Sequence, residues 1–179
     1  MKKPILVVHG GAPTAVINAS LYGVIREAAG HPEAGPVYAA IGGAGGLLRE
    51  ELLDLSTIPA EVIERLPHTP ASAIGTSRDA LEPEHYWTIA KILEKRGIRC
   101  LLFNGGNGSM DACGKIYKAC RERGMELSVV GIPKTIDNDI AVTDHAPGYG
   151  SAARFIAGTV GEISRDVAAL PIHVSVIEA

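Results

Sequence analysis

Short apolar runs alternate with longer amphipathic segments along this chain of 179 residues. The apolar runs have the length of strands, and the amphipathic segments repeat their apolar residues at helical spacing. The predicted strands are Pro4–Val8, Pro36–Ile41, Ile98–Phe103, Glu126–Val130 and His173–Ile177. The predicted helices are Pro13–Ala29, one from Pro83 to Gly97, one that carries Cys113, Ile116, Tyr117 and Cys120 on one face and ends at Gly124, and Gly148–Leu170.

This alternation predicts a three-layer α/β/α fold with a mainly parallel sheet, because a helix between two strands makes a right-handed crossover. Ile98–Phe103 lacks polar alternation, which indicates a strand buried on both faces. Glu50–Leu66 is interpreted as short helical pieces around Pro59, and Pro67–Asp79 as a loop. We expect a donor-binding α/β domain over residues 1–147 and the start of a second α/β domain over 148–179. The chain ends just after the last predicted strand, so we expect a fragment of a longer protein.

Composition narrows the class of protein. Hydrophobic residues make up 46% of the chain and charged residues 21%, as in a globular protein with a real core. The net charge of −3 and the lack of a basic cluster argue against a nucleic-acid partner. No run is long enough to cross a membrane, and no cleavage site follows Met-Lys-Lys, so we expect no signal peptide. Three cysteines without a regular framework indicate reduced thiols and a cytoplasmic protein.

Three glycine-rich turns, Gly10–Pro13, Gly42–Gly46 and Gly105–Ser109, follow predicted strands. Glycine lets backbone N–H groups approach an oxyanion, and a helix N-terminus adds a favourable dipole. Any one of these turns is explained by a tight connection alone. The first and third lead directly into predicted helices, and together they favour a polyphosphate site. The chain lacks a P-loop, since five residues separate Gly108 from the next glycine, and it lacks a dinucleotide G-x-G-x-x-G turn.

The loop after the fourth predicted strand reads Gly-Ile-Pro-Lys-Thr-Ile-Asp-Asn-Asp-Ile over residues 131–140. Taken alone, Asp137 and Asp139 are interpreted as turn-forming residues. A lysine at 134 suits a phosphate, while one carboxylate can hold a metal and the other can deprotonate a hydroxyl. Beside two glycine-rich turns, this inventory favours phosphoryl transfer.

Together these motifs resemble the phosphofructokinase family, in the family's order and over the whole chain. The resemblance rests on Gly10-Gly11 with Pro13 and Asn18, and on Gly75–Arg78, Gly105–Ser109, Pro133–Ile140 and Gly148–Arg154. It implies two similar α/β domains, with the phosphoryl donor held by the first and the sugar phosphate bound at the cleft between them. It also implies a Met-Gly-Arg segment after Ala179 that contacts the sugar.

The resemblance implies a 6-phosphofructokinase of glycolysis that phosphorylates the 1-hydroxyl of fructose 6-phosphate with Mg²⁺ as cofactor. Asp137 would be the base, Thr135 would contact the sugar phosphate or the transferring group, and Arg78 would stabilise the moving phosphoryl group. The implied metal ligands are Asp139 and Asn107, the latter standing where the family usually has an aspartate, with Asp111 nearby as an alternative. The implied donor-binding residues are Gly11, Lys134, Gly106, Asn107, Gly108 and Ser109.

Two positions bear on the donor. Lys134 is typical of pyrophosphate-dependent members, as is the sequence of Pro13–Asn18, whereas Gly108 leaves room for a nucleotide. We expect pyrophosphate rather than ATP. A homo-oligomer is also expected, although His173 replaces an arginine that reaches the neighbouring subunit in bacterial ATP enzymes. The alternatives are a non-catalytic regulatory subunit, which Asn107 makes conceivable, and a related kinase such as an NAD-kinase-like enzyme.

Overall fold

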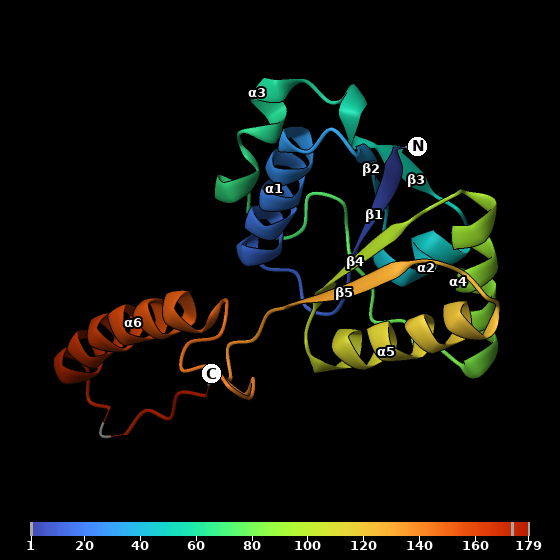
Figure 1. The fold of residues 1–179 in the computed structure, drawn as a ribbon. Helices are drawn as coiled ribbons and strands as arrows, with labels where there is room; N and C mark the ends of the chain where they lie inside the picture. The colour runs from blue at the N-terminus through green and yellow to red at the C-terminus, as the bar shows by residue number, and fades with distance from the viewer. Residues whose placement is uncertain (1, 173, 179) are drawn as a thin grey trace. The chain divides into compact units, whose positions relative to one another are not determined.

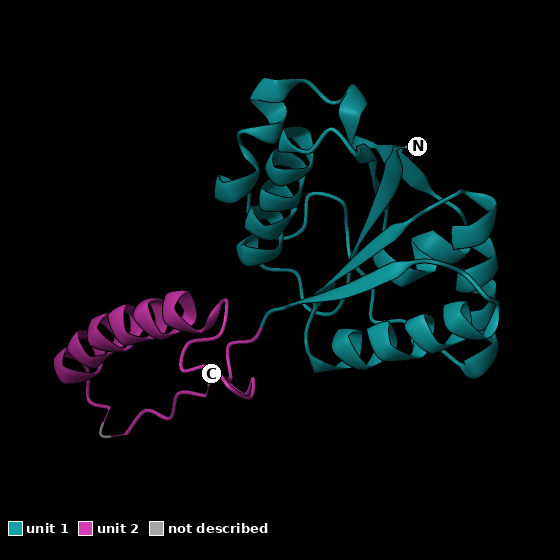
Figure 2. Cartoon of the chain, viewed as in Figure 1, with its two compact units in different colours: residues 1–134 teal, residues 135–179 magenta. Residues whose placement is uncertain are grey.

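The computed structural model describes residues 2–172 and 174–178. The chain divides into two compact units, residues 1–134 and residues 135–179 (Figure 2). The division into domains 1–147 and 148–179 stays a prediction, because these two compact units need not be independent domains.

The first unit is built on a five-stranded sheet in the order β3-β2-β1-β4-β5 (Figure 1). Its strands are β1 (Lys3–His9), β2 (Ala34–Ala40), β3 (Leu52–Asp54), β4 (Cys100–Gly105) and β5 (Ser128–Pro133). All neighbouring strands are parallel except β3, which pairs antiparallel with β2. The sheet is therefore mainly parallel, as predicted.

Helices cover both faces of this sheet (Figure 1). They are α1 (Ala15–Gly30) with the short α3 (Ala60–Ile63) on one face, and α2 (Gly43–Leu48), α4 (Pro83–Lys95) and α5 (Asn107–Glu122) on the other. Two 3-10 helices, Leu55–Thr57 and Leu66–His68, lie on the α1 side. Successive strand residues enter opposite cores: Leu6 packs with the α4 and α5 residues, and Val7 packs with those of α1. The predicted three-layer α/β/α architecture is confirmed.

Three local predictions are wrong, each for a physical reason. Residues 52–54 form a strand inside the segment predicted as helical pieces, because three residues are too few to show alternation. The Gly42–Gly46 turn is mostly helix α2, which is stabilised by the fully buried Leu47. Tyr117, predicted on the same face of α5 as Cys113 and Cys120, is 46% exposed although both cysteines are buried, because it lies about 100° around the helix from the buried Ile116, at the border of this face.

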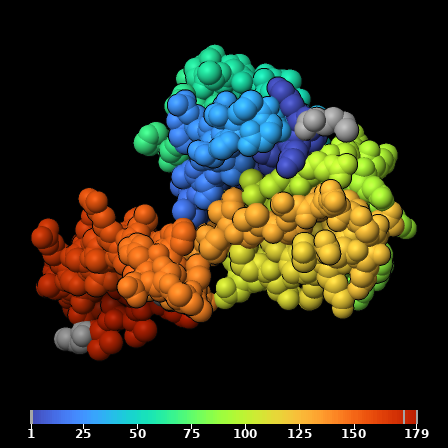
Figure 3. Space-filling view, viewed as in Figure 1, coloured from blue at the N-terminus to red at the C-terminus, as the bar shows by residue number. Residues whose placement is uncertain are grey.

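Strand β4 is buried on one face and half-buried on the other, so the prediction of two buried faces holds only in part. Leu101 and Phe103 are buried under α4 and α5, but Cys100 and Leu102 are only partly covered. β5 is one of the two edge strands of the sheet, and the chain around it forms much of the surface in Figure 3. Val130 of β5 is accordingly exposed.

The second unit consists of a loop, Thr135–Gly148, the helix α6 (Tyr149–Ala169) and an extended tail. Helix α6 was predicted. Of the predicted strand His173–Ile177, His173 lies outside the described residues and residues 174–177 form no strand. A strand needs a hydrogen-bonded neighbour, and the described part of this unit offers none. Among the described residues, no helix combines the length and hydrophobicity needed to cross a membrane.

A buried asparagine holds the loop that leads to the candidate site. Asn18 of α1 is fully buried, and its Nδ2 donates to the carbonyls of Thr69 (2.8 Å) and Ala71 (3.1 Å). Its Oδ1 accepts from the N–H of Ala73 (2.8 Å). One amide therefore satisfies three backbone groups of a loop that has little regular structure of its own.

A buried histidine holds the same loop further along. His9 is fully buried, and its Nδ1 lies 2.8 Å from Ser72 Oγ. The Ser72 hydroxyl donates its one proton to the carbonyl of Gly75 (2.8 Å), so His9 Nδ1 must be the donor to Ser72. Burial lowers the pKa of His9 from its ordinary value of 6.5 to about 4, so the neutral ring is the folded form.

We predict that His9 makes the protein less stable in mild acid. The folded-state pKa lies below the unfolded one, so this stability is complete above pH 6.5 and is lost as the pH falls towards 4. Between pH 7 and pH 5 the loss is about 2 kcal/mol. Denaturant titrations of the wild type and of His9→Asn, which keeps a donor for Ser72, measure this difference. Equal pH slopes for the two proteins would contradict it, and His68→Asn, at an exposed histidine, is the control.

Candidate functional site

A cavity of about 250 Å³ opens where β1 and β4 end at the carboxyl edge of the sheet. Its walls come from the turns after these two strands, from residues 77–79, and from the helices α4 and α5. Four predicted donor-binding residues, Gly11, Gly106, Gly108 and Ser109, line it, together with the predicted catalytic residue Arg78. Open α/β sheets bind ligands at this edge.

The glycines around the cavity differ in the structural reason for having no side chain. A Cβ on Gly10 or on Gly105 would overlap Ser109 Oγ, so these two glycines let the start of α5 approach both strands. Gly11 has φ +77°, a left-handed backbone that glycine adopts without strain. A Cβ on Gly108 would meet nothing within 4 Å, so Gly108 leaves space at the cavity wall.

Hydrogen bonds tie the loop of Arg78 to the turn after β1. The N–H of Gly11 donates to the carbonyl of Ser77 (2.9 Å), and the Thr76 hydroxyl donates to the carbonyl of Gly11 (2.9 Å). Ser77 Oγ accepts from the N–H of Ala44 at the start of α2 (3.1 Å). The sequence alone places these segments far apart, and the structure brings them to one side of the cavity.

Lys134 extends the same site from the end of β5. Its N–H donates to the carbonyl of Gly105 (2.9 Å), and its Nζ lies 3.9 Å from where a Gly11 Cβ would stand. Burial lowers the pKa of Lys134, and the nearby positive charge of Arg78 lowers it further. The partly buried Lys134 and the exposed Arg78 thus lie close enough to repel each other beside the cavity, and a bound polyanion would relieve their repulsion.

The remaining predicted residues are placed as follows. Thr135, Asp137 and Asp139 belong to the second unit, where Thr135 donates its N–H to the carbonyl of Pro147 (2.9 Å) and accepts from the N–H of Asp137 at Oγ1 (3.0 Å). Both aspartates are exposed. Asn107 is the exposed first residue of α5 in the first unit.

The side chains near this site suit a magnesium ion that binds together with the phosphates it coordinates. Among the described residues, no group of three or more His, Cys, Asp or Glu side chains forms a cage for a metal. Mg²⁺ in phosphotransferases is held by one or two carboxylates together with substrate phosphates, so it needs no such cage. An exposed carboxylate such as Asp139 fits this mode of binding.

Sequence reasoning missed several residues of the cavity. Ser77 and Asp79 line it, and only the neighbouring Arg78 was singled out. Tyr86 falls at helical spacing on the apolar stripe of α4, yet it also lines the cavity and lies beneath the Lys115 ammonium, with 5.7 Å from Nζ to the ring centroid. A stripe of apolar residues shows which face of a helix packs against the protein. It does not show whether that face borders the core or a cavity.

Comparisons with known proteins match this geometry. A family model described as phosphofructokinase covers residues 4–179. The pyrophosphate–fructose 6-phosphate 1-phosphotransferase of Xanthomonas campestris is 43% identical over 171 residues, which are 93% of this chain and 40% of that protein. The sulfofructose kinase of Alkalicoccus urumqiensis is 35% identical over 90% of this chain and 42% of its own length. The chain thus spans about two fifths of these relatives.

A solved structure agrees in fold. The crystal structure of the pyrophosphate-dependent phosphofructokinase from Nitrosospira multiformis superposes with a TM-score of 0.87 and 35% identity, over 93% of this chain and 42% of that one. A glycine-lined cavity with two cations at the carboxyl edge of a parallel sheet is the arrangement of an α/β protein suited to polyphosphate. Within that class, the chain belongs to the phosphofructokinase family.

We predict opposite effects for alanine at two glycines of the site. Gly10→Ala places a methyl group against Ser109 and 2.8 Å from Phe103 Cε1, and such overpacking costs ~1–3 kcal/mol of unfolding free energy. Gly108→Ala meets no neighbour at the second position of α5, so it stabilises the protein by up to ~0.5 kcal/mol, less than in a helix centre, while its methyl group narrows the cavity. Denaturant titration measures the unfolding free energy of both variants, and calorimetry measures their affinity for pyrophosphate. A stabilised Gly10→Ala, or unchanged pyrophosphate affinity in Gly108→Ala, would show this view of the glycines to be wrong.

Proposed function

We propose that the protein carrying this chain transfers a phosphoryl group from pyrophosphate to the 1-hydroxyl of fructose 6-phosphate. The observation that carries the proposal is a pair of cations: Arg78 lines the glycine-lined cavity, and Lys134 lies next to its lining residue Gly11. The name of the Xanthomonas relative, a pyrophosphate–fructose 6-phosphate 1-phosphotransferase, supports the donor and the acceptor.

In this proposal the donor occupies the cavity. Backbone groups of Gly11, Gly106 and Gly108, the Ser109 hydroxyl and Asn107 contact it, and Lys134 and Arg78 offset its charge. Arg78 also stabilises the negative charge of the moving phosphoryl group, which a guanidinium can contact with two N–H groups. A polyanion recovers here the electrostatic energy that the two cations lose by lying close together.

The acceptor chemistry belongs to the second unit. Asp137 acts as the general base that takes the proton of the sugar 1-hydroxyl, and Thr135 contacts the sugar phosphate or the transferring group. Both lie on the loop that follows β5. Mg²⁺ would be held by Asp139, with Asn107 as a neutral oxygen ligand, and when bound it would offset charge on the phosphates.

Pyrophosphate is favoured over ATP as the donor. Lys134 is partly buried beside Gly11, where a fixed cation matches the charge density of a small polyanion. The Xanthomonas and Nitrosospira proteins are both named for pyrophosphate. A homo-oligomer is proposed on the family resemblance alone.

Asp137→Asn tests the base. The full-length enzyme is expected to lose at least ~10²-fold in kcat, because general-base catalysis contributes that much, while substrate binding changes only a few-fold. The amide keeps the shape of the loop, and Asp144→Asn, at an exposed carboxylate of the same loop, is the matched control. Steady-state kinetics measure this loss. A variant that keeps more than a tenth of the wild-type kcat would contradict the assignment of Asp137 as the general base.

Lys134→Gly tests the choice of donor. Removing the charge and the volume should weaken the use of pyrophosphate more than that of ATP, since the smaller donor depends more on a nearby cation. Lys134→Met removes the charge but keeps most of the volume, and it separates the two causes. kcat/KM is measured with both donors for all three proteins. Equal losses with pyrophosphate and ATP would mean that Lys134 does not select between them.

A further inference from the structure

Asn138 stands between the proposed base and the proposed metal ligand, and its backbone is unusual. Its φ is +53°, in the left-handed region that asparagine tolerates better than most residues. The chain therefore changes direction between Asp137 and Asp139. Neither aspartate has a positive φ, so the turn between them depends on residue 138.

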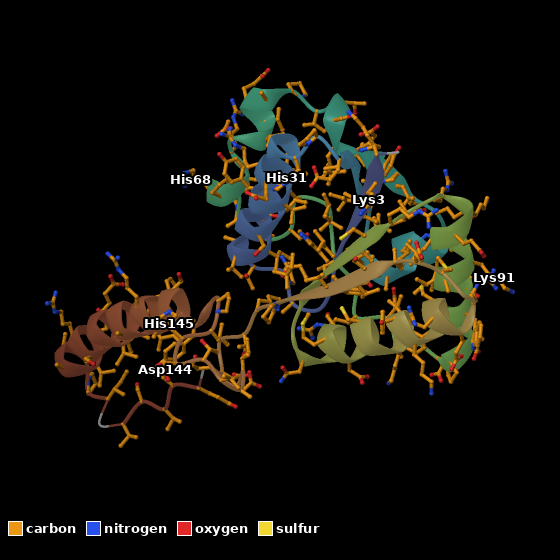
Figure 4. All side chains as sticks on the ribbon, viewed as in Figure 1. Lys3, His31, His68, Lys91, Asp144 and His145 are labelled. Atoms are coloured by element: carbon orange, nitrogen blue, oxygen red, sulfur yellow. The ribbon has the colours of Figure 1, made fainter. Side chains whose placement is uncertain are left out.

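The side chain of Asn138 uses both ends of its amide on the same segment. Nδ2 donates to the carbonyl of Asp144 (3.1 Å), and Oδ1 accepts from the N–H of Ala146 (2.8 Å). Ala146 is fully buried, whereas Asp144 and His145, which Figure 4 labels beside the start of α6, are exposed. The amide thus links the turn of the two aspartates to the anchored end of the loop.

A second link closes the base of this loop. The Thr135 N–H bonds to the carbonyl of Pro147, and Thr135 forms a bridge with Gly148. Asn138 supplies the next tie, a few residues further into the loop, since its two hydrogen bonds reach across to Asp144 and Ala146.

We propose that Asn138 is a positioning residue that fixes the orientation of Asp137 and Asp139 for phosphoryl transfer. The inference rests on the proposed function. Asn138 itself contacts neither the donor nor the acceptor in this scheme; it acts through the backbone that carries the two carboxylates. A misplacement of about 1 Å in a reacting group can cost ~10²-fold in rate, so this tie should appear in kcat.

Asn138→Gly is the decisive variant. Glycine keeps the positive φ without strain and removes both hydrogen bonds, so it separates the side-chain tie from the backbone conformation. Val142→Gly is the matched control, because Val142 is a fully exposed residue of the same loop that also has a positive φ (+65°), and its apolar side chain makes no hydrogen bond. Two measurements are made on each full-length protein: steady-state kinetics with pyrophosphate and fructose 6-phosphate, and amide hydrogen exchange of Ala146 by NMR.

For Asn138→Gly we expect kcat to fall at least ~10-fold while KM for pyrophosphate stays within about threefold, as loss of positioning alone requires. The Ala146 amide should exchange at least ~10-fold faster, because its acceptor is gone. The Gly11 amide, bonded to Ser77 in the first unit, should not change. Val142→Gly should resemble the wild type in both measurements.

Two results would overturn the inference. Unchanged Ala146 exchange in Asn138→Gly would mean that the tie does not hold the loop. Faster exchange with kcat within twofold of the wild type would mean that the tie does not position the carboxylates. If the unsubstituted protein turned over no fructose 6-phosphate, the proposed function would fail and the role of Asn138 with it, and the exchange data would still report separately on the tie.

Discussion

The candidate donor site depends on the close approach of Ser109 to the main chain of two neighbouring strands. Gly10 and Gly105 follow residues paired in register, His9 and Asn104, and the Ser109 hydroxyl packs against both glycines. Any larger side chain at either glycine would push the start of α5 away from the sheet. That contact brings the turns after β1 and β4 together in the wall of one small cavity. The shape of the candidate donor site therefore follows from backbone packing, and its charged side chains are added to that shape.

The electrostatics follow from this geometry. The turn after β1 comes near Lys134 at the end of β5, and the loop of residues 76–78 is hydrogen-bonded to the same turn. Burial and like charge both disfavour the protonated lysine, as its lowered pKa records. A site that holds two cations together at a cost in free energy recovers that cost when it binds an anion. An anion bound near Lys134 and Arg78 would offset this repulsion, so two positive charges favour a phosphate ligand more than a neutral cavity of the same shape would.

The sequence predicts those strands and helices that a local pattern of apolar residues determines. Uninterrupted apolar runs identify β1 and β4, and the spacing of Ile89 and Leu93 identifies α4. It fails where long-range packing decides. Helix α2 contains three glycines, which have low helix propensity, and it forms because Leu47 is buried in the core. In the site, motif resemblance identifies Gly11 and Arg78, but only the fold shows that Tyr86 lines the same cavity. The catalytic roles of Asp137 and Asp139 remain predictions.

The two units secure their functional groups by different means. In the first, glycine contacts and main-chain hydrogen bonds fix the donor cavity, so most side-chain changes nearby should leave its shape intact. In the second, the loop of the two aspartates contains no helix or strand, and its residues are mostly exposed. Such a loop is ordered by the few groups that bind its backbone, and here one amide side chain supplies two of those bonds. The candidate loop of the second unit therefore depends on the two hydrogen bonds of Asn138, whereas the cavity of the first unit depends on many backbone contacts, so one substitution should disturb the loop more than most substitutions disturb the cavity.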